Sequence, residues 1–483
     1  MSAEILRRYQ RDGSRRGPAP DGAFTGAAGG APCGDLVRIS LAIEDGSVAR
    51  ARFDAEGCAI ARAAAAAAAE LAEGAPVLRA ATITPADVAD RLGGLGPQGA
   101  HGAVLAADAL ARALGGAAGS GAALASPPGE GERVAVAVSG GVDSAVAALR
   151  ERRRGAEVVA VTVKLWADRM NDGARSCCSP EAVLGARAMA HSLGIPHFTL
   201  DLEERFRARV VGDFLAGHAA GRTPNPCVLC NGEVRLDAML ELADRLGARA
   251  LATGHYARVA DDGEGPLLAA PADPAKDQTY MLSGVGRETL ARLRFPLAEL
   301  TKPEVRELAA EAGLAVAGRA ESQDLCFLAG EGKRAFLERH GGLAERRGEI
   351  VDAAGAVLGT HRGHHEFTVG QRRGIGIGGG EPLYVLATDA AANRVTVGTR
   401  EQLATRRVRV RHATLHRPGG RVDRVKLRYR SKPLPCSLPA TPPGRHAELS
   451  LELDEPAHGV APGQTACLMD GDMVIGQGTI VAG

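Results

Sequence analysis

Hydrophobic and polar positions follow two different patterns along the chain. Between residues 133 and 202, short continuous apolar runs alternate with segments of helical spacing; the runs lie at 133–138, 156–163 and 196–202. Such runs favour buried strands, and their alternation with helices favours a parallel sheet covered on both faces. From about Arg347 onward, short alternating segments are separated by Gly and Pro. The patterns predict an α/β domain with a doubly wound parallel sheet, followed by a β-barrel-like module.

The N-terminal part has a third pattern. Two alternating runs flank the turn signal Asp45-Gly46, which predicts a hairpin. An alanine-rich stretch at 59–74 then predicts a helix that stops at Gly74. The stretch 116–130 is rich in Gly, Ser and Pro and has no periodicity, so it is expected to be a linker. An α+β domain is therefore expected before the linker.

These patterns divide the chain into four structured parts and one connection. The expected boundaries are 1–115 for the N-terminal α+β domain, 116–130 for the linker, 131–330 for the α/β domain, 331–385 for a central domain and 386–483 for the C-terminal β-barrel module.

Composition narrows the classes of function. The 483 residues carry a formal net charge of +1, so any nucleic-acid surface must be local. The N-terminus has no apolar signal segment, and no apolar run is long enough to span a bilayer. Nine cysteines are too sparse for a disulfide scaffold. We expect a cytoplasmic protein without a membrane partner, in which clustered cysteines serve metal binding or catalysis.

Ser139–Ser144 form a glycine-rich turn that follows a predicted strand and opens a predicted helix. Paired glycines bring backbone N–H groups close to a phosphate, and the helix dipole adds to the attraction. Asp143 could hold Mg²⁺. The loop lacks the G-K-[ST] ending of a Walker A loop, so transfer of the γ-phosphate is not implied. An ordinary β–α turn is the alternative.

Cys227 and Cys230 form a C-x-x-C pair between two prolines and an Asn-Gly pair. This spacing suits half a zinc site, a redox dithiol, two cluster ligands, or a catalytic thiol with a neighbour. The pair by itself does not distinguish these four kinds of site.

The stretch SGGVDS resembles the PP-loop of the ATP pyrophosphatase superfamily, whose members cleave ATP between the α- and β-phosphates and adenylate a substrate oxygen. Over about residues 133–483, the order of further motifs resembles the bacterial tRNA-specific 2-thiouridylase family. These motifs are TVKLWADR, GRTPNPCVLCNGEVRL, ATGHYAR, KDQTYML, ESQDLCFL, FTVGQRRGIGIGGGEPLYV and KLRYRS. The resemblance implies 2-thiolation of the tRNA wobble uridine, with ATP and Mg²⁺. It also implies tRNA and a cysteine desulfurase or sulfur carrier protein as partners.

The resemblance also implies roles for single residues. Cys230 matches the nucleophilic cysteine, and Cys326 matches the cysteine that carries a persulfide or pairs with it. The implied ATP contacts are Ala137, Val138, Ser139, Gly140, Gly141, Val142, Asp143, Ser144, Val163 and Gly254. The implied tRNA contacts are Asn225, Pro226, Cys227, Lys276, Asp277, Gln278, Arg428 and Tyr429, the last two in the β-module.

The chain departs from this family at Cys227, where relatives usually carry Asp. Three thiolates, from Cys227, Cys230 and Cys326, could then hold a [4Fe-4S] cluster with one open iron. Two mechanisms remain open: a persulfide relay between Cys230 and Cys326, or a cluster that delivers sulfide.

The N-terminal part resembles the iron–sulfur scaffold family of the NifU N-terminal or IscU type. Cys33 and Asp35 match its first ligand motif, and Cys58, at a helix start, matches the second. Gly102 stands where the third cysteine is expected, beside His101. The domain either binds a metal, a cluster or a persulfide through Cys33, Asp35, Cys58 and His101, or serves to dock a desulfurase. An ordinary α+β domain is the third alternative.

Two rival functions and one surface complete the expectations. An amide- or guanidine-forming ligase of the same superfamily would need neither Cys230 nor Cys326, and a non-enzymatic sulfur scaffold would need no PP-loop. In the β-module, alternate positions of one strand carry a basic stripe for phosphates. Its members are Arg424, Lys426, Arg428 and Arg430.

Overall fold

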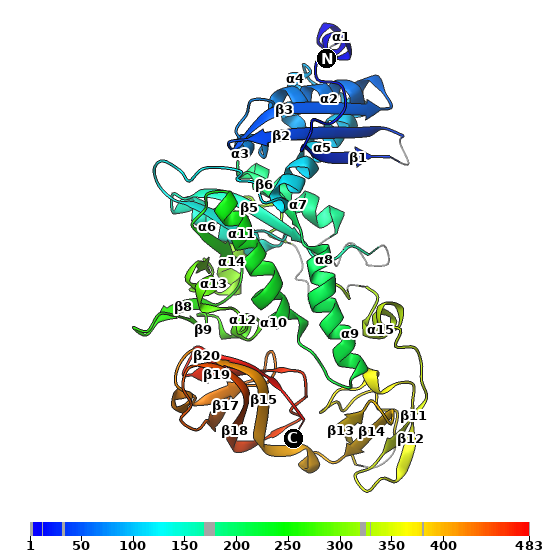
Figure 1. The fold of residues 1–483 in the computed structure, drawn as a ribbon, viewed down its shortest axis with the longest axis vertical. Helices are drawn as coiled ribbons and strands as arrows, with labels where there is room; N and C mark the ends of the chain where they lie inside the picture. Colours follow the sequence, from blue (N-terminus) through cyan, green and yellow to red (C-terminus); the bar gives the residue numbers. More distant parts are fainter. Residues whose placement is uncertain are drawn as a thin grey trace.

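The computed structural model describes residues 3–11, 13–30, 34–168, 179–318, 325–328, 330–378 and 381–482. The N-terminal domain lies at one end of an elongated molecule and the α/β domain in its middle (Figure 1). The barrel and the central domain lie side by side at the other end (Figure 1). No helix within the described ranges combines the length and apolar character needed to cross a bilayer.

The α/β domain is built on a parallel sheet of order β10-β7-β4-β5-β6, as the sequence predicted. Its strands are β4 (Arg133–Ala137), β5 (Glu157–Lys164), β6 (His197–Asp201), β7 (Ala250–Thr253) and β10 (Leu293–Arg294). Its main helices are α6 (Val142–Arg153), α7 (Pro180–Ser192), α11 (Leu236–Arg245) and α14 (Lys302–Glu311). Val134, Ala135 and Val136 of β4 are fully buried, because helices cover both faces of the sheet.

The strand order reverses direction at β4, since β5 and β6 lie on one side of it and β7 and β10 on the other. In open α/β sheets, ligands bind outside the carboxyl ends of the strands at such a switch point. The turns after β4 and β7 are therefore placed to form a binding crevice.

In its described residues, the N-terminal domain has five helices and a three-stranded antiparallel sheet, and α2 and α5 cover the sheet. The strands are β1 (Phe24–Gly29), β2 (Leu36–Glu44) and β3 (Ser47–Glu56). The helices are α1 (Ala3–Arg11), α2 (Ala59–Ala72), α3 (Val77–Ala80), α4 (Pro85–Arg91) and α5 (Pro97–Gly119). The predicted hairpin is present, with Asp45 and Gly46 both at positive φ. Cys33 lies outside the described residues.

The N-terminal domain is held against the edge strand β6 of the α/β domain. A Cβ on Gly115 of α5 would lie 3.0 Å from the Thr199 carbonyl oxygen, so this close approach favours glycine. Arg187 of α7 pairs with Asp108 of α5 at 2.6 Å. A cavity of about 1080 Å³ lies between the two domains, lined by β1, α5, α7, β6 and the segment after β5.

The expected linker is not a free tether. Helix α5 extends to Gly119, so residues 116–119 are helical. The backbone N–H groups of Leu124 and Ala125 donate to the Arg245 carbonyl at 2.8 and 3.1 Å, and Leu124 is fully buried. Small residues predicted flexibility here, but they instead allow the segment to pack closely on the α/β domain.

The central domain and the barrel are two separate sheets. The central sheet contains β11 (Gly348–Val351), β12 (Val357–His361), β13 (Tyr384–Asp389) and β14 (Arg394–Gly398). The expected boundary at 385/386 cuts β13, so the division belongs between Gly398 and Ala404. Both modules consist of short alternating strands, so the sequence pattern did not indicate the boundary between them.

The barrel is closed by pairing of its first and last strands, β15 with β20. Its strands are β15 (Ala404–Leu415), β16 (Arg424–Lys426), β17 (Leu434–Ser437), β18 (Gly444–His458), β19 (Thr465–Asp470) and β20 (Met473–Ile480). A hairpin of the α/β domain, β8 (Arg258–Asp261) and β9 (Pro266–Ala269), pairs with β20 and continues the sheet. The barrel is thus joined to the α/β domain through backbone hydrogen bonds.

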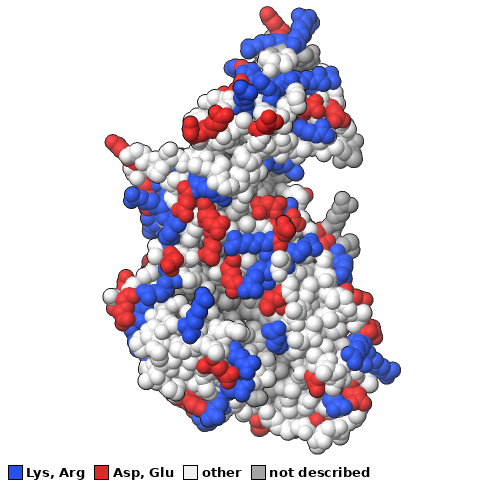
Figure 2. Space-filling view, viewed as in Figure 1, with Lys and Arg blue, Asp and Glu red and all other residues white. Residues whose placement is uncertain are grey.

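The predicted basic stripe is wrong. Strand β16 ends at Lys426, which is buried and points to Asp277 of the α/β domain, 2.7 Å away. Arg428 and Arg430 follow in a turn, where the period of two is lost. Figure 2 shows Lys and Arg interspersed with Asp and Glu over the face in view, as the small net charge suggests.

Candidate active site

The phosphate loop joins β4 to α6 at the switch point of the sheet. Gly140 adopts a positive φ of 73°, and Gly141 is the N-cap of α6 without a side-chain cap. Ser144 Oγ accepts a hydrogen bond from Ser139 N at 3.2 Å and donates to Gly141 O at 2.9 Å. The loop is therefore fixed by its own serine, and the N-cap Gly141 has no side chain that could cover the first N–H groups of α6.

Gly254, directly after β7, packs against this loop. A Cβ at Gly254 would lie 2.7 Å from Ser144 N and 2.8 Å from the Asp143 carbonyl carbon. Val163 lies on the other neighbour, β5, whose Val161 carbonyl accepts a hydrogen bond from Val138 N at 2.9 Å. The expected ATP residues therefore come from β4, β5, β7 and α6.

Asp143 is engaged by two groups that the sequence had not indicated. The Lys302 ammonium, at the start of α14, lies 2.7 and 2.8 Å from its two carboxylate oxygens. The Tyr256 hydroxyl donates to Asp143 Oδ1 at 2.9 Å. The Lys302 side chain is only 10% exposed. This places a cation within the phosphate loop, in contact with the carboxylate expected to hold Mg²⁺.

Cys227 and Cys230 lie in the first two turns of a continuous helical run. The run consists of α10 (Pro226–Cys230), a π-helical segment (Asn231–Arg235) and α11. Residues three apart are neighbours on one helix face, so the two thiols share a face. Asn225 is the N-cap and accepts from Val228 N at 3.3 Å. A π-helical segment next to the thiols is a feature found often at functional sites.

Burial raises the pKa of the Cys227 thiol, and the positive charge of Arg235 partly opposes this. Arg235 itself donates to His255 Nε2 at 2.9 Å. Because Arg has only donors, His255 Nε2 must accept, and its Nδ1–H donates to Thr253 Oγ1 at 2.8 Å. Burial lowers the pKa of His255 to about 3. Since His255 follows Gly254, this chain of contacts joins the cysteine helix to the phosphate loop.

The barrel holds the loop that precedes the cysteine helix. Gln464 Nε2 donates to Thr223 O at 2.8 Å, and Thr223 N donates to Pro462 O at 2.8 Å. The Tyr280 hydroxyl, from α12 (Thr279–Leu282), donates to Thr465 O at 3.0 Å. Figure 1 shows α10 and α12 facing the barrel. The site lies where the α/β domain meets the C-terminal barrel.

The expected tRNA contacts gather at this junction, but several side chains there have structural partners. Asp277 accepts from Thr279 N at 2.8 Å and from Lys426, and Gln278 Oε1 accepts from Tyr256 N at 2.8 Å. Lys276, half-buried, ends the short helix Pro274–Lys276.

Arg428 lies between the barrel and the central domain. Its Nη2 donates to Val369 O at 3.3 Å and to Gly459 O. Tyr429 is half-buried beside it, and the Arg430 guanidinium lies over the Tyr429 ring at 5.4 Å. The predicted contacts from the barrel therefore lie where the barrel meets the central domain.

Cys326 is half-buried and borders the same hydrophobic core as Cys230, which is 8% exposed. The neighbouring Phe327 is almost fully buried, with its ring 5.1 Å from Phe214 and 5.0 Å from Phe336. Residues 325–328, here called the Cys326 segment, are thus anchored by the aromatic ring of Phe327.

Within the described ranges, one group of three His, Cys, Asp or Glu residues has ligand atoms within 4.8 Å of one another, and it contains no cysteine. Cys227, Cys230 and Cys326 therefore do not converge to that distance, and neither do Asp35, Cys58 and His101. The thiolates of a multi-iron cluster bind different irons and therefore stand farther apart than the ligands of a single ion.

In the N-terminal domain, Cys58 is the exposed N-cap of α2. Asp35 accepts from Cys58 N at 2.7 Å and from Cys58 Sγ at 3.3 Å, and Sγ accepts from Ala61 N at 3.3 Å. A Cβ on the buried Gly102 would lie 3.3 Å from Ala61 N, so a side chain there would meet the same helix start. His101 is exposed.

Sequence reasoning missed Arg235, His255, Tyr256 and Lys302. His255 and Tyr256 stand in the motif ATGHYAR, which contributed to the family resemblance but suggested no function for either residue. Lys302 had no motif signal, because its partner Asp143 lies 159 positions away along the chain.

Family models match four successive parts of the chain. They are a NifU-like N terminal domain at 2–118, a tRNA methyl transferase HUP domain at 132–330, a tRNA methyl transferase PRC-barrel domain at 334–399 and an aminomethyltransferase beta-barrel domain at 405–480.

One relative is similar to this chain over nearly its whole length. The Bifunctional protein NifU/MnmA of Rubrobacter xylanophilus is 48% identical over 94% of this chain and 93% of its own length. The tRNA-specific 2-thiouridylase MnmA of Rhodospirillum rubrum is 44% identical over 74% of this chain and 98% of its own. A solved 4-thiouridine synthetase–RNA complex with bound ATP matches 43% of this chain and 48% of its own, at 20% identity and a TM-score of 0.28.

Proposed function

Because the chain belongs to the tRNA-specific 2-thiouridylase family, with a NifU-type domain at its N-terminus, we propose that it uses ATP to thiolate the wobble uridine of tRNA. The observation that carries the proposal is the contact chain from the phosphate loop through Gly254, His255 and Arg235 to the cysteine helix. These contacts support a single site in which the phosphate loop binds the nucleotide and the two thiols handle sulfur.

The phosphate loop is the ATP site in this proposal. The N–H groups at the start of α6 and the Lys302 ammonium bind phosphate oxygens, and Lys302 then exchanges part of its contact with Asp143 for them. Mg²⁺, when bound, offsets phosphate charge, and Asp143 is the carboxylate placed to hold it.

The uracil 2-oxygen attacks the α-phosphorus, and the bond to pyrophosphate breaks. This adenylation converts a poor leaving group into AMP. The target base must be turned out of the anticodon loop to reach the site, as recognition of single-stranded RNA loops generally requires. In this proposal Asn225 and Pro226, at the start of the cysteine helix, receive the base next to the thiols.

Sulfur transfer in the relay version uses two thiols. A desulfurase loads Cys326 with a persulfide, whose terminal sulfur attacks uracil C2 and expels AMP. The Cys230 thiolate then attacks Cys326 Sγ, which forms a Cys230–Cys326 disulfide and releases the thiouridine. An external dithiol reduces the disulfide with two electrons and closes the cycle.

The cluster version rests on Cys227, which shares a helix face with Cys230. Cysteine thiols of this kind suit iron–sulfur ligation. When bound, a cluster would supply an iron-bound sulfide as the sulfur source. Anaerobic purification followed by iron and sulfide analysis separates the versions, since iron-free chain that thiolates tRNA at full rate excludes the cluster.

The central experiment uses the full chain with ATP, Mg²⁺, unmodified tRNA, cysteine and a cysteine desulfurase. Digested tRNA is analysed by mass spectrometry for 2-thiouridine. Cys230→Ser and Cys326→Ser are expected to abolish it, whereas Cys436→Ala, in the barrel core, should retain it. A ligase of the same superfamily would leave the tRNA unmodified, and that result would reject the proposal.

The N-terminal domain is proposed to receive sulfur or a cluster from the desulfurase, through the exposed Cys58. It is docked on β6, so transfer to the active site requires undocking or a partner. Cys58→Ser in the full chain should slow thiolation when the desulfurase is limiting. It should leave thiolation unchanged when excess sulfide, which attacks the adenylated C2 directly and expels AMP, replaces the desulfurase. Unchanged rates in both conditions would leave the domain a structural role only.

A further inference from the structure

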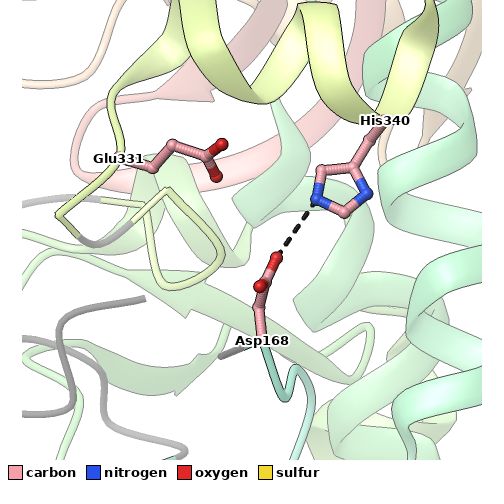
Figure 3. A group of neighbouring side chains, drawn as sticks. All are labelled: Asp168, Glu331 and His340. Atoms are coloured by element: carbon pink, nitrogen blue, oxygen red, sulfur yellow. Dashed lines mark hydrogen bonds and ion pairs between the residues drawn. The ribbon is translucent and has the colours of Figure 1, made fainter. Parts of the chain in front are cut away.

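Asp168, Glu331 and His340 form the one group of three ligand-type side chains within the described ranges whose ligand atoms all lie within 4.8 Å of one another (Figure 3). Asp168 follows β5, Glu331 follows the Cys326 segment, and His340 belongs to α15 (Lys333–Gly341). Three segments that are distant along the chain therefore meet here, beside the Cys326 segment.

The cation that occupies this group is an arginine of the protein. Arg339 donates from Nη1 to Asp168 Oδ1 at 2.9 Å and from Nη2 to Asp168 Oδ2 at 2.6 Å, and Nη2 also reaches Glu331 Oε2. His340 Nε2 lies 3.2 Å from Asp168 Oδ2. The side chains of Asp168 and Glu331 are each 9% exposed. A metal ion would have to displace a guanidinium that already neutralises both carboxylates.

The same helix face also holds the aromatic anchor of Cys326. Phe336, Arg339 and His340 are three and four positions apart and so lie on one face of α15. The Phe336 ring packs 5.0 Å from Phe327. The rings of Phe336 and His340 lie 5.7 and 5.2 Å from Trp166, two residues before Asp168. Helix α15 thus contacts the chain at two points that follow Cys326, at Phe327 and at Glu331.

We infer that α15, through Arg339, is a positioning clamp that fixes the Cys326 segment to the end of β5 for sulfur transfer. Arg339 is a positioning residue, since it acts through Glu331 and Asp168 and not on substrate. Its planar fork suits a bidentate carboxylate, which Lys cannot reproduce. The consequence for catalysis rests on the proposed function of Cys326, whereas the clamp itself does not.

The clamp is tested first by alkylation of Cys326 in the full chain, measured by mass spectrometry of its peptide over time. Arg339→Ala should raise the alkylation rate by on the order of tenfold, because the segment opens more often. Arg339→Lys should lie between Arg339→Ala and wild type. The matched control is Arg334→Ala, on the same helix, which removes ion pairs to Glu345 and Glu366. Equal rates in wild type and Arg339→Ala would overturn the clamp.

Thiolation provides the second measurement. Arg339→Ala should lower kcat on the order of 10- to 100-fold with little change in KM for ATP, because a misplaced nucleophile costs rate and not nucleotide affinity. A change confined to KM for ATP would contradict the clamp. If wild-type chain thiolates no tRNA, the proposed function fails, and the alkylation result still decides the clamp.

Discussion

Replacement of Gly254 by alanine tests whether β7 sets the position of the phosphate loop. The added Cβ would lie 2.7 Å from Ser144 N, about 0.7 Å inside the 3.4 Å at which ordinary contact begins. The neighbours are backbone atoms, which no side-chain rotation can move. The loop or the end of β7 must therefore shift, at a cost to stability of about 1–3 kcal/mol.

A shift of this size turns the first N–H groups of α6 away from the phosphates. Misplacement by about 1 Å costs on the order of 100-fold in rate, or ~2.7 kcal/mol of transition-state stabilisation. We expect kcat/KM for ATP, measured by tRNA-dependent pyrophosphate release, to fall by that factor in Gly254→Ala.

The control for this variant is Gly185→Ala in α7, where a Cβ would meet nothing within 4 Å. This change should leave the rate unchanged and stabilise the helix by roughly 0.5–1 kcal/mol. If Gly254→Ala folds, binds ATP and releases pyrophosphate at the wild-type rate, the contact between β7 and the phosphate loop does not set the geometry of the site.

Three further predictions follow from other parts of the structure. Lys302→Ala removes the ammonium group that contacts Asp143 and should lower kcat/KM for ATP by on the order of 100-fold. Lys302→Arg should stay partly active. A wild-type kcat/KM for Lys302→Ala would show that this residue is not part of the site. Gly102→Cys should restore a third thiol near the start of α2 and therefore raise zinc binding by the full chain. Metal analysis measures the bound zinc, and Cys58→Ser in the same background is the control. No gain in zinc would show that the Cβ, 3.3 Å from Ala61, cannot be accommodated. Burial lowers the pKa of His197 and of His218 to about 3, so the unfolded chain binds more protons below pH 6.5, and stability is lost as pH falls from 6.5 toward 3. Burial also lowers the pKa of His255 to about 3, so denaturant unfolding should show a loss of about 4 kcal/mol from these three histidines between pH 7.5 and 5.5. The loss should be reduced by about a third in His197→Gln and unchanged in a variant of the exposed His458; a pH-independent midpoint would contradict it.

Local patterns carried much of the fold. Continuous apolar runs, glycine turns and alternation marked β4, β5, β6, the hairpin at Asp45-Gly46 and the barrel strands. These signals are local because a buried strand needs apolar residues whatever it packs against. The domain boundaries were predicted less accurately, since the central domain ends near Gly398 and the expected linker packs against Arg245.

By itself, the sequence determined the phosphate loop and the spacing of Cys227 and Cys230, since both depend on residues adjacent along the chain. Only the tertiary structure decided their partners. Lys302 meets Asp143 and Lys426 meets Asp277 through the sheet order and the barrel closure, which no local pattern encodes. The direction of a charged side chain depends on what lies opposite it, and that is fixed only when distant segments pack.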